Sequence, residues 1–166
     1  RCGCRFPDSP IAARRRFLSS GAYRPIAEKT AAIVLGVARV RNDAGAFALL
    51  DAGCGEGYYL DAVARVLACD GTINARCAGI DISKWAVQAA AKHYANHGFF
   101  AVASNRHLPF AAGSLDCILS MFGFSLWDRF AHVQASGGHV LLVDPGPDHL
   151  VELRRLIYPI VRQTSP

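Results

Sequence analysis

The chain has 166 residues, a formal net charge of +5, and a composition that is 52% hydrophobic and 19% charged. These values exclude an intrinsically disordered chain, and the length is that of one domain able to bury its own core. No apolar run approaches the length of a membrane span, and no signal-peptide pattern opens the chain. We therefore expect a cytoplasmic protein without membrane partners, whose N-terminus is trimmed or partly missing because it begins with Arg1.

The six cysteines fit a reduced, cytosolic protein. Cys54, Cys77 and Cys117 fall in or beside expected core strands and turns, where buried free thiols are common. Cys2 and Cys4 form a C-x-C pair with no second pair nearby. A structural zinc site usually needs paired cysteines and two further ligands, so we predict no metal site.

The first 45 residues are expected to be mainly helical. Helices are predicted over 11–20 and from Pro25 onward, and residues 42–45 form a turn. We treat residues 1–45 as an N-terminal helical lid segment and 46–166 as the core of a single domain.

From residue 46 onward, short apolar strands alternate with amphipathic helices. The predicted order is strand 47–51, helix 58–68, a strand ending 78–82, helix 85–96, strand 99–103, strand 115–120, helix 127–134, strand 139–143 and helix 149–161. The alternation predicts an α/β fold with a mostly parallel sheet covered by helices on both faces. Right-handed crossovers make it a doubly wound, Rossmann-like sheet, with a ligand crevice where the strands end.

The most informative motif follows the first strand. Residues 49–57 read Leu-Leu-Asp-Ala-Gly-Cys-Gly-Glu-Gly. Glycines let the backbone adopt positive φ and approach a ligand closely, and such a loop leading into a helix is typical of a nucleotide-cofactor site. Gly53, Gly55 and Gly57 are spaced G-x-G-x-G, whereas the dinucleotide fingerprint needs glycine or alanine where Tyr58 stands.

Asp51 stands just before these glycines. The acid and the glycine spacing together resemble motif I of the class I S-adenosylmethionine-dependent methyltransferases. The resemblance implies S-adenosyl-L-methionine as cofactor, with Asp51 orienting the loop or accepting hydrogen bonds near the methionine ammonium, and Glu56 as a weaker candidate for that role. The alternative is a glycine-rich turn without a ligand.

Two later segments supply partners for the rest of such a cofactor. Asp81 ends the second strand, where a carboxylate can accept both ribose hydroxyls or merely cap the next turn. Ser104 and Asn105 follow the third strand, where these enzymes hold the adenine. The predicted cofactor-binding residues are Tyr23, Asp51, Gly53, Gly55, Gly57, Tyr58, Asp81, Ile82, Ser104 and Asn105.

Longer stretches resemble the 23S rRNA (guanine-N1) methyltransferases. Residues 13–25 are similar to their A-R-R-x-F-L-x-x-G-x-Y-x-P segment, residues 54–59 to C-G-E-G-Y-Y, and residues 145–158 to P-G-P-x-H-L…L-I-Y. The resemblance implies methyl transfer to guanine N1 of rRNA. The arginine run at 14–16 suits RNA contact, although it equally suits a solvated helix face.

The chain departs from that family in two ways. It lacks the N-terminal zinc module of paired cysteines, and it stops before the last two strands of a class I sheet. It is therefore expected to be a fragment or a reduced relative. A small-molecule methyltransferase and a cofactor-binding fragment without activity stay open as alternatives, and the oligomeric state is not indicated.

No residue identifies itself as the catalytic base. His107, Asp128 and Asp144 are candidates by residue type and by their place near strand ends. The aromatic residues of the loop 121–124 can stack a base or pack in the core. No N/D-P-P-Y motif follows the fourth strand, which argues against methylation of an exocyclic amine.

Overall fold

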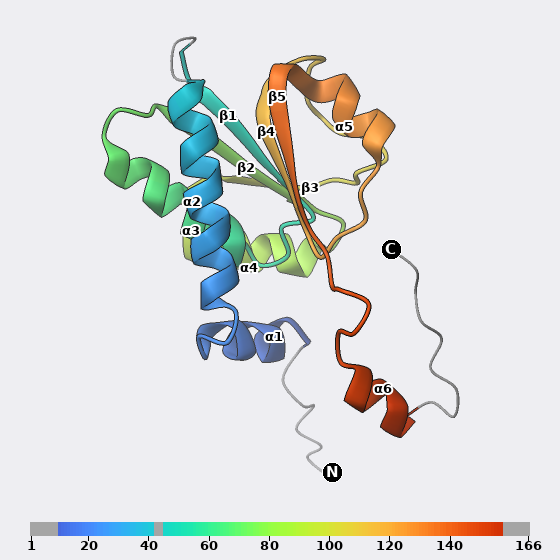
Figure 1. Ribbon diagram of the computed structural model, residues 1–166. Helices are drawn as coiled ribbons and strands as arrows, with labels where there is room; N and C mark the ends of the chain where they lie inside the picture. The colour runs from blue at the N-terminus through green and yellow to red at the C-terminus, as the bar shows by residue number, and fades with distance from the viewer. Residues whose placement is uncertain (1–9, 42–44, 158–166) are drawn as a thin grey trace, which may run out of the picture.

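The computed structural model describes residues 10–41 and 45–157 (Figure 1). Helices and strands alternate through most of this part of the chain. In chain order they are α1 (Pro10–Ser19), α2 (Arg24–Val40), β1 (Phe47–Ala52), α3 (Tyr58–Asp70), β2 (Ala75–Asp81), α4 (Lys84–Tyr94), β3 (Phe99–Val102), β4 (Leu115–Met121), α5 (Trp127–Val133), β5 (Gln134–Val143) and α6 (Val151–Ile157).

The five strands form one parallel sheet in the order β3-β2-β1-β4-β5. The chain moves outward from β1 to β3 and then crosses back to β4, so the order reverses between β1 and β4. In doubly wound sheets a ligand crevice opens at this point, beside the carboxyl ends of the strands. The predicted fold class is confirmed.

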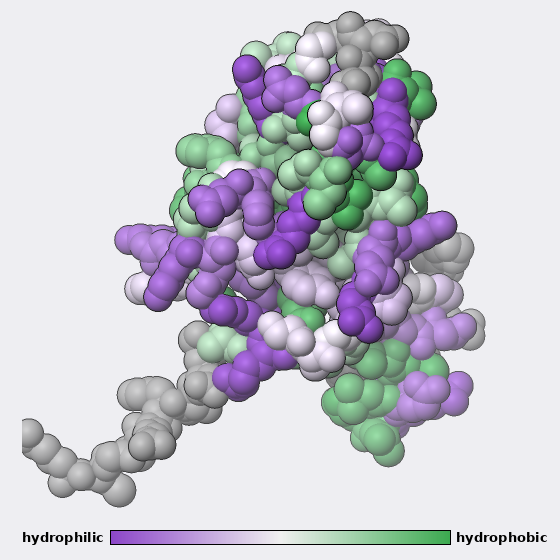
Figure 2. All heavy atoms as spheres, turned by 90° about the vertical axis from the view of Figure 1, so that its left-hand side faces the viewer, coloured by the Kyte–Doolittle hydropathy of each residue, from purple (hydrophilic) through white to green (hydrophobic). Residues whose placement is uncertain are grey.

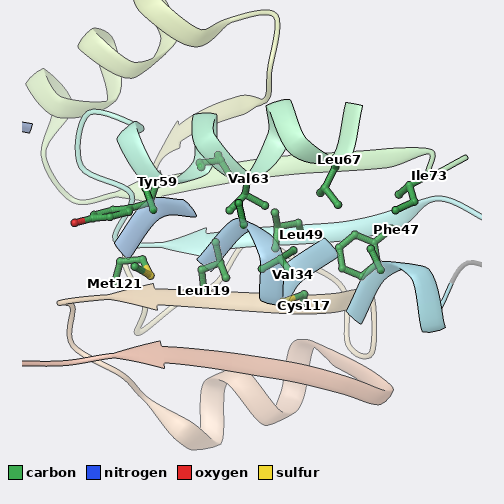
Figure 3. Close-up of a cluster of buried hydrophobic side chains, with 14 residues drawn as sticks. Val34, Phe47, Leu49, Tyr59, Val63, Leu67, Ile73, Cys117, Leu119 and Met121 are labelled. Carbon is green, nitrogen blue, oxygen red and sulfur yellow. The ribbon is translucent and has the colours of Figure 1, made fainter. Parts of the chain in front are cut away.

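One face of the sheet is covered by α2 and α3. Val34 of α2 and Val63 of α3 point toward Leu49 of β1 and Leu119 of β4, and all four side chains are fully buried (Figure 3). Burying each such side chain contributes about 1.5–3 kcal/mol. This face therefore anchors β1 and β4, the two strands that flank the switch point.

The other face is covered by α5. Its Phe130 and Val133 pack with Leu50, Ile80 and Ile118 of the three central strands. Figure 2 shows the opposite side of the molecule, at the left of Figure 1, where many hydrophilic side chains lie on the surface, as expected for helices that turn one stripe to the core.

Two local features concern the start of α4 and the start of β5. Ser83 caps α4, because its Oγ accepts the Ala86 N–H at 3.3 Å. The strand predicted over 139–143 begins earlier, at Gln134, and includes Gly137 and Gly138. The chain passes from α5 directly into the ten-residue strand β5, and these glycines fall where its register with β4 shifts. A bulge of this kind uses the positive φ of Gly137, +69°.

The remaining features concern the cysteines and the ends of the described chain. Cys54 and Cys117 are buried free thiols and Cys77 is partly buried, as predicted. Cys2 and Cys4 lie outside the described residues, as does the end of the helix predicted to reach residue 161. No helix in the described part of the chain is long and apolar enough to cross a membrane.

Candidate cofactor site

A cavity of about 450 Å³ opens at the carboxyl ends of the strands. Each of the strands β1 to β4 is followed by a segment that lines it, and α1 adds one side chain. The lining residues are Arg14, Gly53, Asp81, Ile82, Ala103, Ser104, Asn105, Arg106, Met121, Phe122, Gly123, Phe124 and Leu126. The cavity thus occupies the crevice that the reversal of strand order predicts.

The glycine loop is tied to the end of β2 through its backbone. The N–H groups of Gly53 and Cys54 donate to the carbonyl oxygen of Ile80, at 2.8 and 2.9 Å. The Gly55 N–H donates to Asp81 Oδ2 at 3.0 Å. These bonds hold the loop at the mouth of the cavity, beside Asp81.

Five of the ten predicted cofactor-binding residues line the cavity and five do not. The lining residues are Gly53, Asp81, Ile82, Ser104 and Asn105. The residues that lie elsewhere are Tyr23, Asp51, Gly55, Gly57 and Tyr58.

Gly57 and Gly55 have packing roles in this structure. A Cβ on Gly57 would lie 3.0 Å from the Tyr94 ring and 3.1 Å from the Phe100 ring, and its φ is +86°. Gly55 is buried beneath the guanidinium of Arg14. A side chain at either position would therefore disturb the contact between the loop and its neighbours.

Asp81 has the turn-capping role that the sequence allowed, and its ribose-binding role stays a prediction. Its Oδ1 accepts the Ser83 N–H at 2.8 Å, which is the turn-capping role, and its Oδ2 accepts the Gly55 N–H. The residue also lines the cavity. A carboxylate has about four acceptor positions, so both oxygens retain capacity for further donors.

Ser104 and Asn105 form the wall that follows β3. Ser104 Oγ accepts the Arg106 N–H at 3.2 Å. The Asn105 side-chain amide donates to the Phe124 carbonyl at 3.0 Å and so joins the loop after β3 to the loop after β4. The side-chain oxygen of Asn105 makes no hydrogen bond with the described residues.

Asp51 and Glu56 are two buried acids close to this cavity. Neither oxygen of Asp51 and only one oxygen of Glu56 has a partner among the described residues. The pKa of Asp51 is raised to about 7, chiefly by burial and also by the Asp81 charge, while the Arg14 charge acts to lower it. Both of those charged neighbours line the cavity, so Asp51 lies close behind its wall.

Arg14 is the site residue whose individual role the sequence did not reveal. Its guanidinium lies 3.4 Å from Glu56 Oε2 and also lines the cavity. The sequence indicated only a basic run on a helix, because one helix cannot show which of three consecutive arginines faces the loop after β1. Figure 1 shows α1 at the end of the sheet where the strands finish.

Tyr23 and Tyr58 belong to an aromatic cluster beside the cavity. The Tyr23 ring lies between Phe17 and Phe122, at centroid distances of 5.4 and 5.9 Å, and Tyr58 packs on Tyr59 at 5.1 Å. Phe122 is itself a lining residue. Tyr23 thus packs directly against a residue of the wall, whereas Tyr58 reaches the wall only through Tyr59, which contacts Phe122.

The three candidate bases are separated in the fold. His107 and Asp128 line a second hollow that adjoins the cavity, and Asp144 is exposed beyond the end of β5. None of the three lines the cavity itself.

Comparison with known proteins identifies the family of this chain. Residues 49–146 match the family described as "Methyltransferase domain". The chain belongs to the S-adenosylmethionine-dependent methyltransferases. This confirms the class and the cofactor that the glycine motif indicated.

Two curated relatives carry more specific names. The chain is 31% identical over 150 residues to "Putative 23S rRNA (guanine-N(1)-)-methyltransferase YxjB" of Bacillus subtilis (strain 168), covering 88% of this chain and 50% of the relative. It is 33% identical over 144 residues to the 23S rRNA (guanine(748)-N(1))-methyltransferase of Streptomyces fradiae, covering 86% and 48%. The chain spans about half the length of each.

Solved structures support the fold. The plantazolicin methyltransferase BpumL in complex with SAH has a TM-score of 0.65 over 89% of this chain and 58% of that one, at 20% sequence identity. At this identity the likeness concerns the arrangement of the sheet and helices.

Proposed function

We propose that the cavity at the carboxyl ends of β1 to β4 binds S-adenosylmethionine, and that the protein methylates N1 of a guanine in 23S rRNA. The observation that carries the cofactor site is the presence of two buried acids, Asp51 and Glu56. Buried carboxylates without full hydrogen bonding are costly, and a cationic, hydrogen-bonding amino group is what would satisfy them.

The residues present fit the other parts of the cofactor. Asp81 retains acceptor capacity toward the cavity and can receive ribose hydroxyls while holding the Gly55 N–H. Ser104 and Asn105 offer side-chain oxygens and backbone groups to the adenine.

The cofactor, when bound, supplies a methyl group on a positively charged sulfur. The chain would orient it through the acids named above. Guanine N1 carries a proton that some group must accept. His107 and Asp128 are the better candidates, because they line the adjoining hollow whereas Asp144 does not.

The N-terminal segment 1–45 contributes to the site through α1, which carries Arg14, whereas α2 packs into the core. We infer that α1 is the part of this segment that acts as a lid. The guanidinium of Arg14 lies over the glycine loop and has to share Glu56 with a bound amino group.

The rRNA assignment is supported by the names of the two curated relatives and by the net charge of +5. The test incubates the chain with labelled S-adenosylmethionine and an unmodified 23S rRNA transcript, followed by mass spectrometry of the nucleosides. We expect 1-methylguanosine, and we expect Asp81→Asn to reduce it strongly. A different methylated nucleoside would overturn the guanine-N1 assignment, and transfer to small metabolites in place of rRNA would overturn the rRNA assignment.

A further inference from the structure

A second hollow, of about 640 Å³, adjoins the cofactor cavity. It is lined by residues 106–107 of the loop after β3, residues 124–126 of the loop after β4, and residues 127–129 at the start of α5. Arg106, Phe124 and Leu126 line both spaces, so the two share a wall. A molecule seated in the second hollow would therefore lie next to a cofactor seated in the first.

Two aromatic side chains of this hollow are largely exposed. Phe124 is 75% exposed and Trp127 is 57% exposed. The Trp127 ring contacts Phe130, at a centroid distance of 6.4 Å, which anchors one side of the indole and leaves much of it open. Exposed aromatic rings beside a hollow are suited to stacking a planar ligand.

The loop that carries Phe124 is held from both sides. The carbonyl oxygen of Phe124 accepts a hydrogen bond from the Asn105 side-chain amide at 3.0 Å. The hydroxyl groups of the next residue, Ser125, and of Ser120 are hydrogen-bonded at 2.9 Å. The backbone at Phe124 is thus held before any ligand binds, which lowers the entropy lost on binding.

The charge of the hollow is positive. Two arginines, Arg106 and Arg129, line it, against the single acid Asp128. The guanidinium groups of Arg106 and Arg129 make no hydrogen bond or ion pair with the residues that the structure describes, whereas Arg39 and Arg41 are paired with aspartates. Unpaired guanidinium groups next to open aromatic rings complement a phosphate next to a base.

We propose that this hollow binds an unpaired nucleotide of the RNA substrate. The base stacks on Trp127 and Phe124, and the flanking phosphates bind Arg106 and Arg129. This inference rests on the proposed function, because it assigns the acceptor side of the same site. An unpaired nucleotide is favoured over a duplex, because stacking on a protein ring needs a base with a free face.

The two tryptophans provide a built-in control. Trp127 lines the hollow, whereas Trp85 lies at the start of α4, 71% exposed and outside it. We titrate Trp85→Phe and Trp127→Phe, each with one remaining tryptophan, with a guanine-containing single-stranded RNA of 12 nucleotides. We expect RNA to quench the fluorescence of Trp127 and to leave that of Trp85 unchanged. Quenching of Trp85 alone, or of neither tryptophan, would overturn the proposal.

Affinity measurements give a second test. Trp127→Ala should weaken binding of the same RNA about tenfold, the usual effect of removing a stacking platform. Arg129→Gln should also weaken RNA binding. The dependence of log K on log salt concentration should become shallower by the equivalent of about one phosphate contact. Arg76→Gln, an exposed arginine on β2, is the matched control and should change neither. Equal RNA affinity of Trp127→Ala and the unaltered chain would overturn the proposal.

Failure of this inference is distinguishable from failure of the proposed function. Trp127 and Arg129 do not line the cofactor cavity, so their variants should bind S-adenosylmethionine with unchanged affinity. If the cofactor binds and rRNA is methylated while Trp127→Ala leaves RNA affinity intact, only the nucleotide site is wrong. If RNA stacks on Trp127 but no methyl group is transferred, the nucleotide site stands and the proposed function fails.

Discussion

Asp51 and Glu56 are acids in places that usually hold apolar side chains, and neither has its full set of hydrogen bonds among the described residues. Such groups destabilise a protein unless a ligand satisfies them. Buried polar groups that lack hydrogen-bond partners are more typical of functional sites than of structural ones. The acids therefore reduce the stability of the free protein and are available for a cofactor.

The pKa of Asp51 makes this cost measurable. Its value rises from an ordinary 3.8 to about 7 because of burial and the nearby Asp81 charge. The folded state thus holds the Asp51 proton more tightly than the unfolded state does. The resulting stability is complete below about pH 4 and is lost as pH rises through 7.

Asp51→Asn should therefore raise the unfolding free energy at pH 8 without cofactor, by up to about 4 kcal/mol. The gain should shrink toward pH 5, where Asp51 is already protonated in the folded chain. Urea unfolding at both pH values checks this. The exposed Asp148→Asn should show no pH-dependent difference from the unaltered chain. An Asp51→Asn chain less stable than the unaltered chain at pH 8 would contradict the assigned environment.

At the scale of elements, the β1–α3 connection fits tightly against α4. The Gly57 position faces the Tyr94 ring, the Phe100 ring and the Ala90 methyl group, all at 3.0–3.2 Å from where a Cβ would stand. This glycine sets how closely the loop and α3 approach the β2–α4 unit. The loop geometry at the cavity depends on that approach.

Gly57→Ala should accordingly destabilise the fold by about 2–3 kcal/mol, from its positive φ and from overpacking. Gly36→Ala is the matched control. Gly36 lies inside α2 with nothing within 4 Å of a new Cβ, so this change should stabilise the chain by about 0.5–1 kcal/mol. Denaturant unfolding of both variants measures the contrast, and equal effects would show that Gly57 is not packed as described.

At the scale of the whole molecule, the alternating pattern of strands and helices was sufficient to predict the sheet and its crevice. The spacing of apolar residues shows which segments are buried strands and which are amphipathic helices. Their alternation, with right-handed connections between strands, then gives the parallel sheet. The bulge at Gly137 was not predictable, because glycines with positive φ mark turns and bulges alike.

The sequence predicted those parts of the site that depend on where strands end, and it missed those that depend on how helices dock. Gly53, Asp81 and Ser104 were predictable because the carboxyl ends of parallel strands meet at one edge. The position of Arg14 over the loop depends on how α1 docks, which is a tertiary contact that no local pattern records. The exposure of Trp127 was not predictable either, because its place in the helical pattern of α5 suits a buried helix face equally well.

The central claim is that the cavity seats S-adenosylmethionine with Asp81 on its ribose. Isothermal titration calorimetry of the chain with S-adenosylmethionine tests this most directly. We predict saturable one-site binding that Asp81→Ala weakens by about 1–3 kcal/mol through lost hydrogen bonds, while Asp148→Ala has no effect. Absence of binding, or an Asp81→Ala affinity equal to that of the unaltered chain, would contradict the account.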